Sequence, residues 1–230
     1  MKNVGCRIIN EINRPDVEVV NLFKGLPVSN IDDCMNRIGA IDSQFFPLNK
    51  TPLLGVAFTV KVPEGDNLMF HKAMDMAEPG DIIMIDAGGD KRRAILGELM
   101  ISYCKSRGIA GVIVDGSIRD ADALEEMDFP VYAKGITPNG PYKNGPGEIN
   151  TPVTIGGQVV RPGDIIVGDQ DGVVIIKPED AKELAEQTRR VMDKEASIME
   201  KIVKEGTYDR PWVDEKLKEL NSEYITLRTM

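Results

Sequence analysis

The sequence predicts an α/β fold in which strands and helices alternate along most of the chain. Three observations support this prediction. Short apolar runs such as residues 53–62, 82–85 and 112–114 are typical of buried strands, and segments with helical spacing separate them. Turns that contain glycine or proline mark the changes between the two patterns. A long helical pattern follows Pro178, so we expect the chain to end in a helical extension.

The first half of the chain contains two early helix candidates. Ser29 and Asn30 have side chains that suit an N-cap, and the helix that they begin is expected to stop at Gly39. Asn67 is expected to cap a second helix, which carries the only histidine, His71. This histidine has no Ser or Cys partner pattern, so we interpret it as a packed residue and not as a catalytic base.

The middle of the chain continues the alternation. Residues 86–90, "DAGGD", are expected to form a turn, because they lack the G-x-G-x-x-G spacing of a nucleotide-binding loop. Residues 93–108 predict a helix that ends at Gly108. A strand at "AGVIVDG", a helix from about Asp120 and a strand at "FPVYAK" follow.

The last third is expected to be less regular. Residues 135–150 are rich in Gly, Pro and Asn and predict an irregular loop, and four short strands follow before Pro178. The string "PGDII" occurs at residues 79–83 and 162–166, which we interpret as one turn solution used twice. Residues 1–190 are expected to form the α/β domain. Residues 191–230 are expected to form a helical extension that packs on this domain or on a neighbouring subunit and includes a short helix held by Trp212.

Composition excludes several classes of function. The net charge of −9 argues against nucleic acid as a partner, because phosphate binding needs a basic face. No apolar segment is long enough to span a bilayer, and the N-terminus lacks the apolar core of a secretory signal. Three widely separated cysteines show no metal-ligand spacing and suggest reduced thiols. We therefore expect a cytoplasmic protein with no nucleic-acid or membrane partner.

The stretch "GVIVDGSIRDADAL" places Arg119 directly before Asp120 at a predicted strand-to-helix turn. Asp120 could simply cap the helix, with Arg119 as its surface ion partner. The segment "GELM", residues 97–100, favours a second interpretation. A glycine at a helix start lets an anion approach exposed backbone amides, a guanidinium fits a carboxylate, and a carboxylate suits Mg²⁺ or Mn²⁺. Together these residues would form a site for a small oxo-acid bound to a metal.

The segment from "PEGDNLMF" through "GELM" to "DGSIRDADAL" resembles the class II pyruvate aldolases of the 4-hydroxy-4-methyl-2-oxoglutarate / 4-carboxy-4-hydroxy-2-oxoadipate type. Their relatives include the RraA-type regulators of ribonuclease E. The resemblance covers roughly residues 27–195, and its signature is an acidic residue, a gap of twenty and then Arg-Asp, here Glu98 and Arg119-Asp120. The family usually has Asp at the position of Glu98. The resemblance implies a layered α/β sandwich of the swivelling-domain, RraA-like kind.

The resemblance also implies roles for individual residues. Arg119 would bind the carboxylate and keto oxygen of a pyruvyl group, and Asp120 would be the one direct protein ligand of a divalent metal cation, Mg²⁺ or Mn²⁺. Glu98 would hydrogen-bond the waters of that metal. Asp33 and Glu195 would reach the site from a neighbouring subunit of a homo-oligomer, a trimer or a hexamer. The substrate-binding residues implied are Gly97, Glu98, Leu99, Met100 and Arg119.

The activity that the resemblance implies is retro-aldol cleavage of a 4-hydroxy-2-oxo acid to pyruvate and a second carbonyl compound. The metal and Arg119 would stabilise the pyruvate enolate, and oxaloacetate decarboxylation would be a side activity because it forms the same enolate. The alternative is a non-enzymatic RraA-type regulator that binds a ribonuclease, and such regulators typically lack the aspartate after the arginine. A methyltransferase has no support, since no cofactor-binding loop is present.

Overall fold

The computed structural model describes residues 3–225 of the chain. By its internal contacts the chain divides into two compact units, Met1–Arg189 and Arg190–Met230. The strands are β1 Cys6–Ile8, β2 Phe46–Pro47, β3 Leu53–Lys61, β4 Asp81–Leu96, β5 Gly111–Ile118, β6 Val131–Ile136, β7 Gly147–Ile149, β8 Val153–Ile155, β9 Gln158–Val160, β10 Ile165–Asp169 and β11 Gly172–Ile176. The helices are α1 Val17–Val20, η1 Asn21–Phe23, α2 Val28–Cys34, α3 Leu68–Met76, α4 Glu98–Ser106, α5 Ala121–Glu125, η2 Pro178–Asp180, α6 Ala181–Glu205 and α7 Pro211–Glu219.

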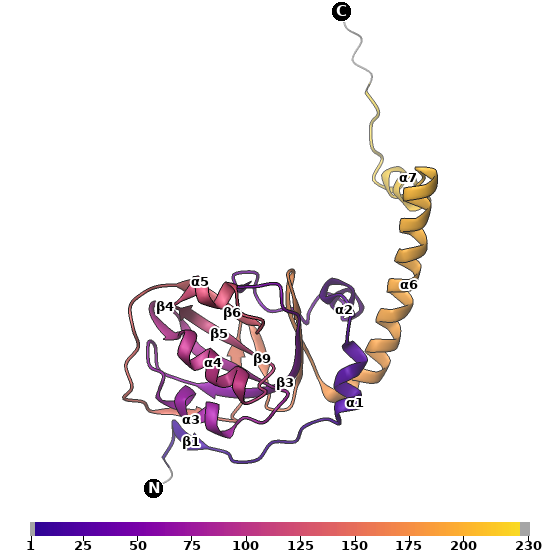
Figure 1. The fold of residues 1–230 in the computed structure, drawn as a ribbon. Helices are drawn as coiled ribbons and strands as arrows, with labels where there is room; N and C mark the ends of the chain where they lie inside the picture. Colours follow the sequence, from indigo (N-terminus) through magenta and orange to yellow (C-terminus); the bar gives the residue numbers. More distant parts are fainter. Residues whose placement is uncertain (1–2, 226–230) are drawn as a thin grey trace, which may run out of the picture. The chain divides into compact units, whose positions relative to one another are not determined.

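The first unit is built on a mixed sheet in which β3, β4, β5 and β6 are parallel neighbours (Figure 1). Strand β3 also pairs antiparallel with β7 and β10, and β10 pairs with β11. The crossover helices α3 and α4 connect the parallel strands, as parallel pairing requires. This alternation confirms the predicted α/β class.

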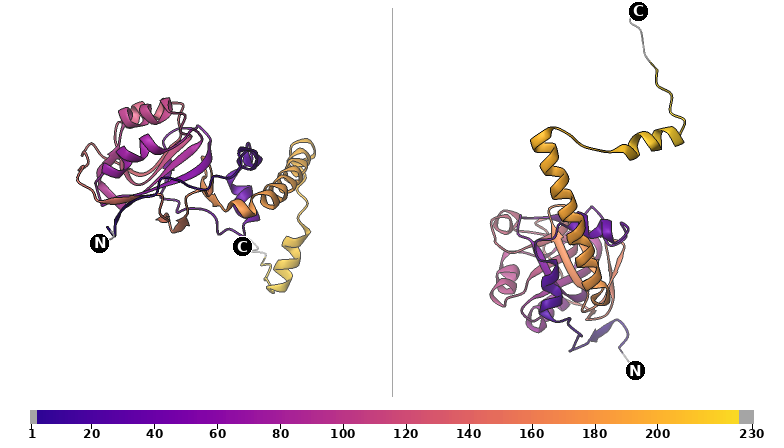
Figure 2. Two further views of the ribbon diagram at one scale, coloured as in Figure 1. Left: turned by 90° about the horizontal axis from the view of Figure 1, so that it is seen from below. Right: turned by 90° about the vertical axis from the view of Figure 1, so that its right-hand side faces the viewer.

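Side chains of the parallel strands alternate between two hydrophobic cores. On one face, Ile83 and Ile85 of β4 pack in a cluster with apolar residues of α3, α4 and α5. On the other face, Ile82 and Met84 pack in a second cluster, which includes residues of the β8–β9 hairpin. Successive strand residues point to opposite faces, so a strand buried on both faces is a continuous apolar run. Figure 2 shows helices on one face of the sheet and the hairpin on the other, which confirms the layered architecture.

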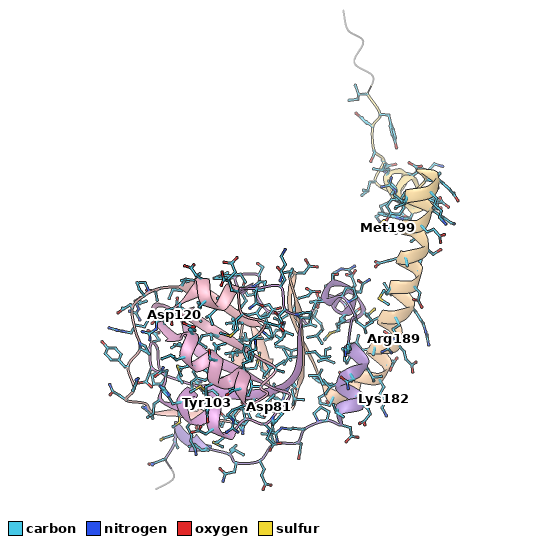
Figure 3. All side chains as sticks on the ribbon, in the orientation of Figure 1. Asp81, Tyr103, Asp120, Lys182, Arg189 and Met199 are labelled. Carbon is cyan, nitrogen blue, oxygen red and sulfur yellow. The ribbon has the colours of Figure 1, made fainter. Side chains whose placement is uncertain are left out.

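The parallel strands bring the predicted site together. At the end of the β4–β5 pair, Leu96 lies beside Ile118, so the residues that follow each strand are neighbours. The twenty residues between Glu98 and Arg119 therefore form the rest of α4, the turn after it and β5, which brings the chain back to the same edge of the sheet. Figure 3 shows Asp81, where β4 begins, and Asp120, after β5, at opposite ends of these strands.

Two boundaries in the middle of the chain differ from prediction. The helix predicted from Arg93 begins only at Glu98, because the preceding residues 94–96 are buried strand paired with β5. The predicted "DAGGD" turn lies inside the long strand β4, where Gly88 and Gly89 have φ values of 68° and 72° and the register with β5 shifts. Strand pairing therefore outweighs local helix and turn preferences in this segment.

Two further boundaries were also wrong. Helix α2 ends at Cys34 and not at Gly39, because Asn36 and Arg37 adopt positive φ values of 58° and 61° that a helix cannot accommodate. Residues 135–150 are not wholly irregular, since β6 continues to Ile136 and β7 pairs with β1 and β3. Non-local pairing of this kind leaves little trace in the local sequence.

The repeated "PGDII" string forms the same turn twice, as predicted. Gly80 and Gly163 have φ values of 90° and 96°. In each turn the aspartate that follows donates its N–H to the carbonyl three residues earlier and accepts that residue's N–H at Oδ2, at 2.8 Å for Asp81 and 2.7 Å for Asp164. Both aspartates are buried, Asp81 as the first residue of β4 and Asp164 directly before β10.

The C-terminal helical extension is present. Helix α6 runs from Ala181 to Glu205, and α7, in the second unit, covers the predicted short helix. Trp212 was expected to hold that helix in place, but it is 64% exposed and therefore is not buried within the second unit. None of the described helices combines the length and the apolar composition that a bilayer crossing requires.

Candidate active site

A pocket of about 500 Å³ lies where β4 and β5 end and α4 begins. Its lining includes Arg119, Asp120 and the segment 97–100, so the structure brings the predicted signature residues to one cavity. His71 from α3 and Lys143 from the loop before β7 also line it. The arrangement agrees with the general preference of open α/β sheets for ligands beyond the carboxyl ends of their strands.

Gly97 occupies the N-cap of α4 in an extended conformation, with φ −157° and ψ −167°. This conformation suits any residue, so backbone strain does not explain the glycine. A Cβ atom at Gly97 would lie 2.2 Å from Oδ2 of Asp120 and 2.9 Å from Cγ of Arg119. The glycine is therefore needed for the close approach of the Arg-Asp pair to the start of α4.

Asp120 occupies the N-cap position of α5, but its side chain makes no capping hydrogen bond there. Its backbone is left-handed, with φ 58°, and its Oδ2 accepts a 3.0 Å hydrogen bond from the N–H of Glu98. The simple capping interpretation is thus wrong for α5. The carboxylate instead satisfies the first backbone amide of α4, where the positive end of the helix dipole also attracts it.

Arg119 lies beside this carboxylate, with Nε 3.6 Å from Oδ2 of Asp120. The two side chains are 46% and 42% exposed, so both can meet a ligand from the pocket. A Cβ on Gly140 would approach Nη1 of Arg119 to 3.5 Å, which shows that the guanidinium lies against the loop after β6. This loop and the strand end together define the position of the cationic group.

The helix start keeps one amide available. The Glu98 N–H is occupied by Asp120, while the N–H of Met100 is directed to the carbonyl of Gly97 at 3.2 Å. Within residues 3–225, the N–H of Leu99 has no hydrogen-bond acceptor. The sequence suggested several free backbone amides at this helix start, whereas the described structure leaves only the amide of Leu99, a residue that is 84% exposed.

The donor set suits a hard divalent cation that retains most of its waters. Asp120 offers a half-exposed carboxylate whose Oδ1 has no hydrogen-bond donor within the described chain, and the Glu98 side chain is exposed beside it. Across the described part of the chain, no group of three or more His, Cys, Asp or Glu side chains could enclose a metal ion. A cation here would thus have one direct carboxylate ligand, consistent with the preference of Mg²⁺ for few protein ligands.

His71 and Lys143 were not among the predicted site residues. The buried positions of α3, Met69, Phe70, Ala73 and Met74, place His71 at the rim of the apolar face, so that its half-buried ring lines the pocket. Burial, and then the charge of Lys143, lower the pKa of His71 below its usual value. No motif marks either residue in the sequence, because the loop that carries Lys143 meets α3 only through the fold.

Two predicted residues lie elsewhere. Asp33 is on α2, which is separated from α4 and α5 in the views of Figures 1 and 2, and its carboxylate pairs with Arg37 at 2.9 Å. Glu195 belongs to the part of α6 in the second unit. Their predicted role, from a neighbouring subunit, remains a prediction.

The match to known proteins agrees with this geometry. A family model described as "RraA-like: Aldolase/RraA" matches residues 28–175. The chain belongs to the RraA-like family. The match includes the whole pocket, from α3 through α4 to the loop that carries Lys143.

Among the similar proteins are some named as aldolases and some named as RraA inhibitors. A Halalkalibacterium halodurans protein named "Putative 4-hydroxy-4-methyl-2-oxoglutarate aldolase" is 40% identical over 187 residues, which cover 80% of this chain and 89% of the relative. A Streptomyces coelicolor structure, titled as an unusual member of the RNase ES inhibitor RraA protein family, is 26% identical with a TM-score of 0.72 and covers 81% of this chain and 100% of that chain. The RNA-processing inhibitor RraA of Thermus thermophilis is 27% identical with a TM-score of 0.61, over 66% and 92% of the two chains.

Proposed function

We propose that this RraA-like protein is a divalent-metal-dependent aldolase that cleaves a 4-hydroxy-2-oxo acid to pyruvate and a second carbonyl compound. One observation carries the proposal. The guanidinium of Arg119 and the carboxylate of Asp120 lie together at the start of α4 and open into one pocket. The name of the Halalkalibacterium halodurans relative supports the same reaction class.

In this proposal Arg119 binds the 2-oxo acid end of the substrate. Its planar fork can donate hydrogen bonds to two oxygens, and the N–H of Leu99 at the helix start offers a further donor. When the 4-hydroxyl gives up its proton to solvent, C4 becomes a carbonyl and the bond between C3 and C4 breaks, leaving its electron pair on the pyruvyl fragment as an enolate that solvent later protonates at C3. The enolate oxygen is more negative than the carbonyl oxygen of the substrate. The fixed positive charge of Arg119 stabilises this oxygen more strongly in the transition state than in the substrate.

Asp120 would hold the cation directly, and Glu98 would hydrogen-bond its waters. When bound, such a cation acts as a Lewis acid that stabilises the developing enolate. The hydrogen bond from the Glu98 N–H to Oδ2 fixes the Asp120 carboxylate before any ligand arrives. The site is thus preorganised, because the carboxylate need not reorient when the ligand binds.

Two further lining residues suit the fragment that leaves. Lys143 provides a positive charge there, and burial, together with that charge, lowers the pKa of His71 and so favours its neutral imidazole. A negatively charged group on the far end of the substrate would meet Lys143. Oxaloacetate forms the same enolate when it loses CO₂, so we propose its decarboxylation as a side activity.

The test is a pyruvate-release assay with a series of 4-hydroxy-2-oxo acids and oxaloacetate, in Mg²⁺ or Mn²⁺ and in chelator. The proposal expects release that chelator abolishes and that added cation restores. If no substrate releases pyruvate under any of these conditions, the aldolase proposal is wrong. The alternative, a regulator that binds a ribonuclease, is suggested by the titles of the Streptomyces and Thermus structures and would then become the leading candidate.

A further inference from the structure

A second cavity of about 440 Å³ lies in the first unit, between α2, β9, β11 and the start of α6. It shares no lining residue with the pocket of the proposed active site. Apolar side chains form much of its wall, including Met35, Ile38, Val159 and Leu184. Its chemistry is set by a buried carboxylate, that of Asp164.

The two copies of the proline-glycine-aspartate turn differ in how the aspartate is neutralised. Asp81 receives a bidentate guanidinium, with Arg14 Nε 2.9 Å from Oδ1 and Nη2 2.8 Å from Oδ2. Asp164 is only 5% exposed, and among the described residues the sole hydrogen bond to its carboxylate is the one that Oδ2 accepts from the Arg161 N–H. The Oδ1 atom, which Arg14 neutralises in the other copy, thus has no donor.

The basic residues of the cavity do not replace that partner. Arg161 and Lys177 act on Asp164 as charges at longer range, and their side chains form no hydrogen bond with it within the described structure. Three more carboxylates surround the same cavity and outnumber these two cations. They are Glu179, Asp180 and Glu183.

The geometry points to a guanidinium-binding site in this cavity. Asp164 would bind the guanidinium of a ligand, as Asp81 binds the guanidinium of Arg14 in the first turn. The ligand would carry this group at the end of a short apolar chain. A metal ion fits less well, because no group of three or more His, Cys, Asp or Glu in the described chain could hold one, and one oxygen of Asp164 is already used. The apolar wall accepts the chain of the ligand, and the buried carboxylate accepts its planar head. This site goes beyond the proposed aldolase function and does not depend on it.

The test uses n-butylguanidinium as the probe, with binding measured by calorimetry on the full chain. Asp164→Asn keeps the oxygen that accepts the Arg161 N–H but removes the charge, so we expect at least a tenfold loss of affinity. The matched control is Asp171→Asn, which removes an exposed charge outside the cavity and should leave affinity unchanged. The neutral analogue n-butylurea should bind at least tenfold more weakly than the guanidinium.

A second variant guards against a folding defect in the first. Val159 is 52% exposed at the rim, so Val159→Trp can fill the cavity without disturbing the core, and it should abolish probe binding.

The guanidinium could come from a free small molecule or from an arginine of a second copy of the chain. Sedimentation of the parent with and without probe distinguishes these two sources. If the mass of the protein assembly is the same with and without probe, the group belongs to a free small molecule. If this mass falls when probe is added, and is also lower in Asp164→Asn, the group belongs to an arginine of a second copy. Equal binding by the parent and Asp164→Asn, or no binding by the parent at millimolar probe, overturns the inference.

Discussion

At the residue scale, Asp120 has a left-handed backbone and a carboxylate bonded to the first amide of α4. Asparagine tolerates the left-handed region as well as aspartate does, and its Oδ1 can accept the same N–H. Asp120→Asn should therefore change the free energy of unfolding by less than about 1 kcal/mol. It removes the charged ligand of the proposed cation, so pyruvate release should fall roughly a thousandfold or more. A urea melt and a pyruvate assay on this variant decide the matter, and a stable variant with full activity would end the aldolase proposal.

Arg119 is predicted to act through both its charge and the planar geometry of its guanidinium. Lysine keeps the positive charge but lacks the planar fork, so Arg119→Lys should raise KM and lower kcat together, by roughly tenfold or more overall. Steady-state kinetics on pyruvate release measure both constants. Arg7→Lys is a matched control, because Arg7 pairs with Glu148 and lies outside the pocket lining. A change confined to KM would show that Arg119 binds the substrate without stabilising the transition state.

Asp164 gives a prediction for the pH dependence of stability. Burial raises the pKa of its carboxyl in the folded chain above the unfolded value. The ionised form therefore destabilises the fold above the raised pKa, and this penalty disappears below the unfolded pKa. Asp164→Asn, which carries no such penalty, should be most stable relative to the parent near pH 7, and the difference should shrink as the pH falls toward 4. Urea melts of both proteins at several pH values test this, and a difference that grows on acidification would contradict it.

At the element scale, the start of α4 depends on the contact between Gly97 and Asp120. A Cβ at Gly97 would lie 2.2 Å from the Asp120 carboxylate, so Gly97→Ala should break the hydrogen bond to the Glu98 amide and cost about 1.5–3 kcal/mol. With Asp120→Gly in place the same substitution should cost much less, because the atom that it strikes is gone. A double-mutant cycle by urea unfolding measures this coupling, and additive effects would refute it. Leu99→Met, at an 84% exposed position, is the silent control.

The elements also show what the sequence could predict and what it could not. Helices α3, α4 and α6 and the apolar strands follow from periodicity and punctuation, because their patterns are local. The continuation of β4 through residues 86–96 was missed, since its support comes from β5, which lies later in the chain. The site divides in the same way. Glu98, Arg119 and Asp120 form a recognisable motif, whereas Lys143 reaches the pocket from a loop whose position depends on the whole fold.

At the scale of the whole molecule, the resemblance predicts a homo-oligomer with threefold symmetry. Asp33 does not line the pocket of its own chain, which is expected if it serves a neighbouring subunit. Two inactive variants, Asp120→Asn and Glu195→Gln, should then regain part of their activity when their subunits are mixed and exchanged. Light scattering gives the mass of the assembly, and a pyruvate assay gives the recovery. A fully active monomer, or no recovery in verified mixed oligomers, would contradict a shared site.

The pairing of Leu96 with Ile118 also bears on how the family can change over time. The residues that follow β4 and the residues that follow β5 are brought together by the register of the two strands. The length of the chain segment between them therefore has no direct effect on the chemistry. The turn at residues 107–110, between α4 and β5, lies at the opposite end of β5 from the site. This turn could gain residues without moving the residues that follow either strand. A slip of one residue between β4 and β5 would instead turn every side chain to the wrong face. Insertions are therefore expected to accumulate at this turn, and a search that insists on a gap of twenty would overlook relatives that work in the same way.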